Sequence, residues 1–410
     1  MGLLPVDEAL VRLLADASPI EGVEMVSLSQ ARGRVLARDL AATRTQPPFP
    51  ASAMDGYAVR HSDIVGSLPE LTVVGQSAAG HGFAGEIGPG EAVRIFTGAP
   101  LPAGADTVVI QEDVEALPDA RIRIVEGSDA GRHIRKAGLD FSDGETLLHA
   151  GERLDAGRLM LAAAMNHASV PVRRKPRIAI LATGDELVLP GERPGPDQIV
   201  ASNTIGVAAM IEDGGASVID LGIARDSLEA IQAAVDKAVS EGADVLVTLG
   251  GASVGDHDLV QQALTGRGMV LDFWKIAMRP GKPLMFGRLG GMRILGLPGN
   301  PVSSVVCTHL FLRPLVARLA GLDHADPVID AVLGDAMPAN DHRQDYVRAT
   351  LGRDERGRPV ATPFARQDSS MMRTFALSDC LIVRAPHAPE AKAGDPCRIR
   401  LLRPWQAVTG

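Results

Sequence analysis

The chain has 410 residues, which is too long for one hydrophobic core, so two to four domains are expected. A net charge of −9 and an aromatic content of 3% argue against a nucleic-acid partner, and no apolar run approaches the roughly 20 residues of a membrane span. The N-terminus lacks the basic region and long apolar core of a signal peptide. We therefore expect a cytoplasmic protein that binds neither nucleic acid nor membrane.

The first part of the chain contains two helical segments with a strand-rich region between them. Helical spacing of apolar residues predicts helices over 6–15 and 155–168. Short Val- and Ile-rich runs, punctuated by glycine, predict strands at 71–74, 92–95, 107–110 and 121–124. The simplest arrangement is a discontinuous N-terminal helical domain, residues 1–45 and 145–172, with a β-rich domain, residues 46–144, inserted into it.

From residue 177 onward, strands and helices alternate. The spacing predicts strands at 177–181, 216–221 and 244–249, and helices at 203–213, 227–240 and 301–319. This alternation indicates a parallel sheet with helices on both faces, over residues 173–325. Short strands return later, at 347–351, 380–383 and 397–402. They predict a small β-barrel or sandwich over residues 326–410.

Three loops should lie together at the carboxyl ends of the parallel strands, where open sheets of this kind bind ligands. They are 183–186 (Thr-Gly-Asp-Glu), 250–255 (Gly-Gly-Ala-Ser-Val-Gly) and 298–301 (Pro-Gly-Asn-Pro). Each alone can be a turn without a ligand, but three on one edge favour a site. Gly250 and Gly251 would expose backbone N–H groups, and Ser253 would add a donor, as in a phosphate-binding loop.

The same glycine loop also fits a different chemistry. Residues 251–255 spell G-x-S-x-G, the nucleophile elbow of serine hydrolases, with Ser253 as the nucleophile. No His-Gly-Gly oxyanion segment occurs upstream, and Asp-His-Asp at 256–258 replaces the apolar helix expected next. A serine hydrolase therefore stays open as an alternative function.

Two proline- and glycine-rich loops, 278–283 (Met-Arg-Pro-Gly-Lys-Pro) and 297–301 (Leu-Pro-Gly-Asn-Pro), give the strongest signal for a site. Proline fixes φ and glycine permits positive φ, so both loops should be rigid. Arg279 and Lys282, held near a helix N-terminus, are suited to binding an oxyanion. A charge-assisted hydrogen bond contributes roughly 1.5–3 kcal/mol, so two such cations would orient a dianion strongly.

The acidic candidates have simpler explanations as well. Asp55 and Asp140 can be turn residues, and Asp226 followed by Glu229 fits a capping box of the next helix. Carboxylates beside a phosphate loop would nevertheless suit Mg²⁺. Spacing alone does not assemble these carboxylates into one site.

Seven segments, taken in order, resemble the molybdopterin molybdotransferase family, which includes MoeA and the E domain of gephyrin. They are 52–58 (SAMDGYA), 96–99 (FTGA) with 104–106 (GAD), 138–140 (GLD), 183–187 (TGDEL), 250–256 (GGASVGD), 279–283 (RPGKP) and 297–303 (LPGNPVS). The resemblance spans essentially the whole chain. It implies an elongated four-part homodimer with a MogA-like α/β/α domain and a C-terminal β-barrel. The implied reaction inserts molybdate into adenylylated molybdopterin, releases AMP and uses Mg²⁺.

The resemblance also implies roles for individual residues, at a site between the MogA-like domain of one subunit and the inserted domain of the other. Catalytic positioning is implied for Asp55, Thr97, Asp140, Glu186 and Asp226. Three of these are implied metal ligands: Asp55, Asp140 and Glu186. Pterin binding is implied for Gly250, Gly251, Ser253, Asp258, Pro298 and Pro301. Molybdate binding is implied for Arg279, Lys282, Arg348 and Ser369.

The chain departs from the family pattern in the expected site. Asp368 and Arg373 add charges near the molybdate pocket, and Leu139 stands where an acid is usual. The implied partners are a molybdopterin adenylyltransferase that delivers the substrate and molybdoenzymes that receive the product. A further alternative is a non-catalytic scaffold, as in gephyrin, which would keep the fold without turnover.

Overall fold

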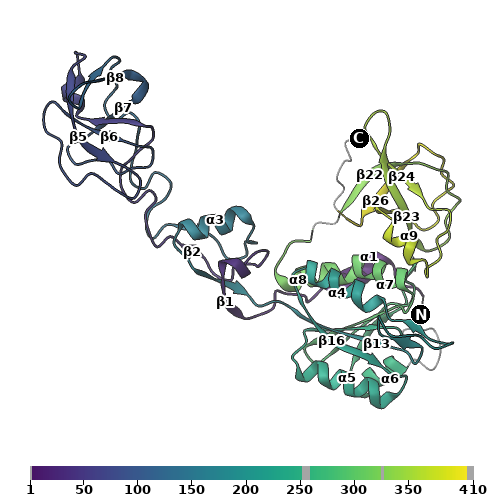
Figure 1. Ribbon diagram of the computed structural model, residues 1–410. Coiled ribbons are helices and arrows are strands. Elements are labelled where there is room, and N and C mark those ends of the chain that lie inside the picture. Colours follow the sequence, from purple (N-terminus) through teal and green to yellow (C-terminus); the bar gives the residue numbers. More distant parts are fainter. Residues whose placement is uncertain (1, 252–258, 325–326, 404–410) are drawn as a thin grey trace. The chain divides into compact units, whose positions relative to one another are not determined.

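The computed structural model describes residues 2–251, 259–324 and 327–403. The chain divides into two compact units (Figure 1). One unit is continuous, Met25–Val172, and the other combines Met1–Glu24 with Arg173–Gly410. Buried apolar residues form separate core clusters within these units, so each is stabilised by its own hydrophobic contacts.

The continuous unit contains the expected β-rich insertion. Its six-stranded sheet has the order β7-β4-β6-β5-β9-β8. The strands are β4 (Gly56–Val59), β5 (Glu70–Ser77), β6 (Glu91–Ile95), β7 (Thr107–Ile110), β8 (Val114–Leu117) and β9 (Arg121–Ile124). Val108 and Val109 are both buried yet belong to different core clusters. This follows because successive side chains of a strand point to opposite faces, so both faces of the sheet are covered.

The rest of this unit joins two segments that are far apart in sequence. One core cluster combines residues of 31–42 with residues of 141–172. The segments also pair as strands, β2 (Leu40–Ala41) with β11 (Thr146–Leu148) and β1 (Val23–Ser27) with β12 (Ser169–Arg173). Helix α3 (Ala156–Ala164) starts at Asp155, whose side chain accepts a hydrogen bond from the Arg158 N–H. The expected discontinuous part is therefore present.

The first helix, α1 (Val6–Leu14), differs from the expectation. We grouped it with 145–172, but the structure places it in the other unit. Its stripe of Val6, Ala9 and Leu13 is buried in the core cluster that contains Phe311 and Leu315. Apolar spacing predicts a helix and its buried face, but it does not identify which core covers that face.

The α/β domain has a six-stranded sheet of order β16-β13-β17-β21-β20-β18. Its strands are β13 (Arg177–Thr183), β16 (Ser217–Ala224), β17 (Val245–Leu249), β18 (Val270–Trp274), β20 (Met285–Leu289) and β21 (Met292–Leu297). β16, β13, β17 and β21 are mutually parallel, as expected. β20 runs antiparallel to both of its neighbours, because the apolar stretch before residue 297 folds into a hairpin at Gly290.

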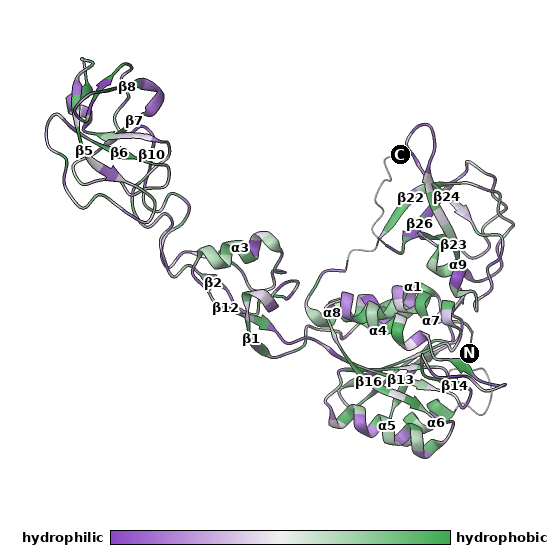
Figure 2. Ribbon diagram, in the orientation of Figure 1, coloured by the Kyte–Doolittle hydropathy of each residue, from purple (hydrophilic) through white to green (hydrophobic). Residues whose placement is uncertain are grey.

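Helices cover both faces of this sheet. Figure 1 shows α5 (Leu228–Ser240) and α6 (Leu259–Gly266) on one face, and α1, α4 (Asn203–Asp213), α7 (Pro301–Cys307) and α8 (Arg313–Ala320) on the other. Two core clusters correspond to these two layers. α5 and α6 carry hydrophobic and hydrophilic stretches side by side (Figure 2), as expected for helices with one buried face. The three-layer α/β/α domain is confirmed.

One helical segment, 301–320, is long and apolar enough to span a membrane by length and composition. Its most apolar window is 89% buried within the molecule, as in the core helix of a globular domain. A π-helical turn, Thr308–Leu312, separates α7 from α8. Pro314 follows directly, and a proline that lacks an N–H interrupts the regular helical ladder at such a point.

The C-terminal domain is a closed β-barrel. Strands pair in the order β23-β24-β22-β26-β25, and β25 pairs back with β23. They are β22 (Val328–Leu333), β23 (Gln344–Arg353), β24 (Pro359–Pro363), β25 (Cys380–Arg384) and β26 (Pro396–Leu401). The expected barrel is confirmed. A short strand from the α/β domain, β19 (Met278–Arg279), adds in parallel to β23 and so ties the 278–283 loop to the barrel.

Candidate functional site

A cavity of about 890 Å³ lies at the carboxyl ends of β13, β17 and β21. The three loops predicted to meet at this edge all line it, together with the start of α4 and one residue of the barrel. The lining includes Thr183, Glu186, Asn203, Asp226, Gly250, Gly251, Pro283, Pro298, Pro301 and Ser370. The volume is in the range of sites that bind small organic ligands. The structure therefore brings together the described residues proposed for pterin binding.

The glycine turn after β17 depends on its two glycines. Gly250 and Gly251 have φ values of +96° and +64°, a region that other residues rarely adopt. A Cβ on Gly250 would lie 2.8 Å from the Thr183 carbonyl oxygen, and one on Gly251 would lie 2.1 Å from the Val260 side chain. The close packing leaves backbone, not side chain, at the cavity wall. Ser253 and Asp258, and with them the G-x-S-x-G segment after Gly251, lie outside the described residues.

Carboxylates gather at one side of the cavity. Glu186 follows β13, and Asp226 follows β16. The backbone N–H of Asp226 donates to Asp185 Oδ1 over 3.3 Å. Burial raises the pKa of the Asp226 carboxyl, and repulsion from Asp185 and Glu186 raises it further. A hydrogen bond from the Asp185 backbone lowers this pKa but does not cancel the rise. Two other carboxylates, Asp185 and Glu186, thus act on Asp226.

The interpretation of Asp226 as a helix cap is wrong. Helix α5 is capped by Ser227, whose hydroxyl accepts a hydrogen bond from the Ala230 N–H over 3.2 Å. Because the serine satisfies the helix end, the neighbouring Asp226 side chain is available to the cavity that it lines.

The 298–301 loop is held by side-chain amides. Asn203, at the start of α4, donates from Nδ2 to the Gly299 carbonyl over 2.7 Å. Asn300 donates from Nδ2 to Ser369 Oγ over 2.9 Å, and the Ser369 carbonyl accepts from the Val302 N–H over 3.1 Å. The barrel segment around Ser369 therefore contacts the N-terminus of α7. Neither Asn203 nor Ser370 is among the predicted site residues, although a polar residue at a helix start beside a sheet edge is a usable signal.

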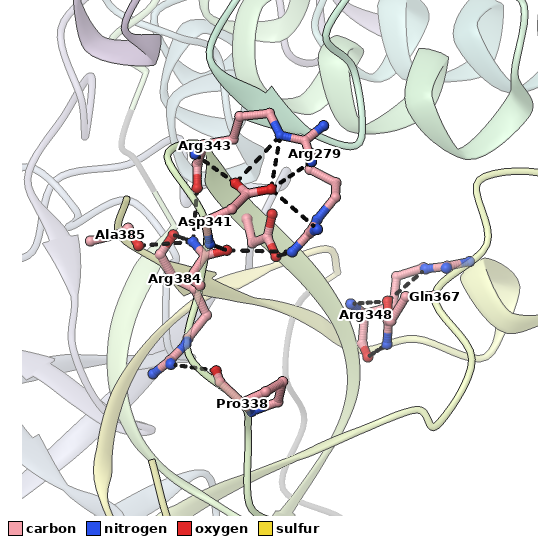
Figure 3. A network of polar contacts seen from close by, with 10 residues as sticks. Arg279, Pro338, Asp341, Arg343, Arg348, Gln367, Arg384 and Ala385 are labelled. Carbon is pink, nitrogen blue, oxygen red and sulfur yellow. Dashed lines mark hydrogen bonds and ion pairs between the residues drawn. The ribbon is translucent and has the colours of Figure 1, made fainter. Parts of the chain in front are cut away.

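Arg279 lies at a second cavity, of about 490 Å³, lined mainly by barrel residues. Its guanidinium bonds to the carboxylate of Asp345 and lies 3.6 Å from that of Asp341, which also pairs with Arg343 (Figure 3). The hydrogen bond to Asp345 raises the pKa of Arg279. Its charge is therefore largely neutralised. Lys282 is exposed, and Pro283, at the end of the same loop, lines the first cavity.

Arg348, on β23, has different surroundings. Its side chain is 1% exposed, and its Nε donates to Gln367 Oε1 over 3.1 Å (Figure 3). Its Nη1 donates to the Met371 carbonyl over 3.3 Å. Burial lowers the pKa of Arg348, and the attraction of Asp368 only partly opposes this. Met371 closely follows Ser369, so two of the proposed molybdate residues lie near one barrel segment.

The remaining predicted residues belong to the other compact unit. The Thr97 N–H and hydroxyl both donate to Asp55 Oδ1, over 2.7 and 2.8 Å, and these bonds lower the pKa of Asp55. Asp140 lies beside Gln46, whose carbonyl accepts from the Asp140 N–H over 3.0 Å. Within the described parts of the chain, no group of three His, Cys, Asp or Glu side chains is arranged to hold a metal ion.

Known proteins match the chain along nearly its full length. Three sequence profiles match in order: the MoeA N-terminal region (domain I and II) at residues 4–166, a probable molybdopterin binding domain at 179–318, and the MoeA C-terminal region (domain IV) at 330–402. The second profile spans the G-x-S-x-G segment, so the serine hydrolase alternative is not favoured.

Individual relatives agree with the profiles. A molybdopterin molybdenumtransferase of Haemophilus influenzae is 35% identical, with 97% of this chain and 98% of the relative covered. One of Bacillus subtilis is 33% identical, with 99% and 97% covered. A crystal structure of the molybdopterin biosynthesis moea protein from Pyrococcus horikosii superposes with a TM-score of 0.83 at 31% identity, covering 98% of this chain and 100% of that one. The chain therefore belongs to the MoeA family of molybdopterin molybdenumtransferases and has a role in molybdenum cofactor biosynthesis.

Proposed function

We propose that the chain inserts molybdate into adenylylated molybdopterin, with cleavage of the adenylate and release of AMP. The observation that carries this proposal is the 890 Å³ cavity, where glycine backbone, carboxylates and a rigid proline loop meet at the carboxyl edge of the sheet. The names of the full-length relatives support a transfer of molybdenum to molybdopterin. The chemistry would then depend on positioning and electrostatics, without a covalent nucleophile.

In this proposal the cavity binds the pterin part of the substrate. Backbone N–H groups of Gly250 and Gly251 would bind its phosphate, with Ser253 and Asp258 completing the loop. Pro298 and Pro301 form a rigid wall, because the loop between them is fixed by Asn203 and Asn300. Molybdate would bind beside this wall, near Ser369, Arg348, Arg279 and Lys282.

A Mg²⁺ ion fits the carboxylate side of the cavity. Glu186 and Asp226 supply the hard oxygen donors that Mg²⁺ prefers, and the negative charges of Asp185 and Glu186 act on Asp226. Bound there, Mg²⁺ would supply positive charge beside the phosphate oxygens of the substrate. The two carboxylates would also hold water molecules that complete the coordination of the ion.

We further propose that the active protein is a cytoplasmic homodimer whose sites are shared between subunits. Asp55, Thr97 and Asp140 belong to a separate compact unit, and the paired hydrogen bonds from Thr97 keep Asp55 ionised and fixed. The inserted unit of one subunit would bring these residues to the cavity of the other. An adenylyltransferase would deliver the substrate, and molybdoenzymes would receive the product.

The activity is tested by AMP release. Purified protein given adenylylated molybdopterin, Mg²⁺ and molybdate should release AMP, and omission of molybdate should reduce the release; tungstate in a parallel reaction measures anion preference. Tight substrate binding without AMP release would instead favour a non-catalytic scaffold.

Complementation tests the shared site. Asp55→Asn and Glu186→Gln proteins should each be inactive. When the two proteins are combined and allowed to exchange subunits, about a quarter of the wild-type activity should return. Half of the random dimers then contain one subunit of each variant, and each such dimer has one intact site. No recovery, with mixed dimers detected by mass, would contradict a site made from two subunits.

A further inference from the structure

The feature that carries this inference is a buried arginine from which no carboxylate among the described residues accepts a hydrogen bond. Arg348 is 1% exposed, and charged side chains are almost never buried to this extent unless they are paired. Its Nε and Nη1 donate to neutral oxygens, and its Nη2 is buried with no hydrogen-bond partner in the part of the chain that the structure describes. A guanidinium held in this way has one end left to bind an anion.

The side chain of Gln367 holds this arginine through four hydrogen bonds. Its Oε1 accepts from the Arg348 backbone N–H over 3.0 Å and from Nε over 3.1 Å (Figure 3). Its Nε2 donates to the carbonyls of Arg348, over 3.0 Å, and Phe364, over 2.8 Å. The amide therefore fixes the backbone and the guanidinium of Arg348 at the same time. These four are all the hydrogen bonds that a glutamine amide can make.

The same barrel segment leads to the wall of the first cavity. Gln367 and Met371, which both bond the Arg348 side chain, flank Ser369 and Ser370. Ser369 is bonded to Asn300, and Ser370 lines the cavity. A change in the position of Gln367 would therefore move the arginine relative to this wall.

The identity of the residue at 367 determines whether a carboxylate bonds the Arg348 guanidinium directly. A glutamate would accept the same two N–H bonds, but its carboxylate would pair with the guanidinium. It would also face the carbonyls of Arg348 and Phe364, to which the amide now donates. A neutral amide is the group that fixes Arg348 without neutralising it.

We propose that Gln367 is a positioning residue that holds the Arg348 guanidinium in place without a carboxylate bonded to it, so that Nη2 binds a tetrahedral oxyanion. The inference deepens the proposed function, on which it rests for the identity of the anion as molybdate. Gln367 itself does not touch the anion. Its role is to keep a cation buried, oriented and unpaired.

The test measures molybdate binding directly, by equilibrium dialysis without the pterin substrate. Gln367→Glu should weaken binding about tenfold or more, because the new carboxylate competes with the anion for Arg348. Gln344→Ala is the matched control: Gln344 is also on β23, and its amide nitrogen donates to the Tyr346 hydroxyl over 2.6 Å. This variant should bind molybdate as the wild type does.

A double-mutant cycle separates positioning from folding. In an Arg348→Met background, Gln367→Glu should have little further effect on molybdate binding, because no guanidinium remains for it to pair with. Equal weakening in both backgrounds, no weakening in the single variant, or no binding by the wild type would overturn the proposal. Absence of AMP release, with the dialysis results as expected, would contradict the proposed reaction and leave this inference standing.

Discussion

Arg279 and Arg348 have the same predicted role, yet the structure gives them different surroundings. The Arg279 side chain is 49% exposed and pairs with Asp345 and Asp341, whereas the Arg348 side chain is buried and, within the described residues, bonds to neutral oxygens. Arg279 stands in the more prominent motif, between a methionine and a Pro-Gly-Lys-Pro run. A cation therefore attracts an anionic ligand less strongly when carboxylates of the protein already pair with it.

The largest expected effect is on molybdate binding after loss of Arg348. Arg348→Met should weaken molybdate binding about tenfold to a hundredfold, the effect of losing one charge-assisted hydrogen bond of roughly 1.5–3 kcal/mol. Equilibrium dialysis measures this directly. Because a methionine fills similar space and removes a buried unpaired charge, the melting temperature should fall little or rise. Unchanged molybdate binding would remove Arg348 from the site.

Loss of Arg279 should instead reduce stability more than molybdate binding. Arg279→Ala leaves the buried Asp345 carboxylate without its main partner, so the unfolding free energy should fall by about 1–3 kcal/mol. Molybdate binding should weaken by no more than about threefold, since the arginine's charge is already neutralised in the wild type. Denaturant unfolding and dialysis measure the two quantities. If Arg279→Ala weakens molybdate binding as much as Arg348→Met, the comparison fails.

A smaller effect concerns the acidic side of the cavity. Because the pKa of Asp226 is raised in the folded chain, this carboxyl binds its proton more strongly there than when unfolded. Its contribution to stability therefore falls as the pH rises from the unfolded value through the folded one. Asp226→Asn should raise the melting temperature slightly at pH 7, by about one to two degrees, and have little effect at pH 3.

The same variant tests the metal ion. If Asp226 is a Mg²⁺ ligand, Mg²⁺ should raise the melting temperature of the wild type at pH 7, and the shift should be smaller in Asp226→Asn. Asp220→Asn, on the preceding strand β16, serves as a control for a general loss of negative charge. Equal Mg²⁺ shifts in all three proteins would argue against Asp226 as a ligand.

Much of the fold was predictable because its signals are local. Helix α4 occupies the predicted residues 203–213, and the four predicted strands of the insertion are all present. Periodicity reports which residues are buried, and each of these elements buries one face or both. It does not report the partner, so α1 was assigned to the wrong unit. The antiparallel strand β20 was missed because its apolar run continues into β21, broken only by two glycines.

The site was predictable to the same extent. Motifs at the strand ends predicted the location of the cavity, because the topology of a parallel sheet brings these ends together. Asp345, which neutralises Arg279, and Gln367, which holds Arg348, were not identified. Each acts on a residue that is distant along the chain, so the spacing of residues in the sequence does not reveal the contact. Ser227 was overlooked as the cap because Asp226, beside it, fits the same pattern.

The inserted β-rich part leaves and re-enters its unit at adjacent points. The Gln46 N–H donates to the Phe141 carbonyl over 2.9 Å, and the Gln46 carbonyl accepts from the Asp140 N–H. A short linker could therefore join the chain on the two sides of this contact, and the whole insertion could be removed without stretching the backbone. The protein is in this sense divisible: the α/β and barrel portion could be made and studied apart from the module that the chain carries as an insertion.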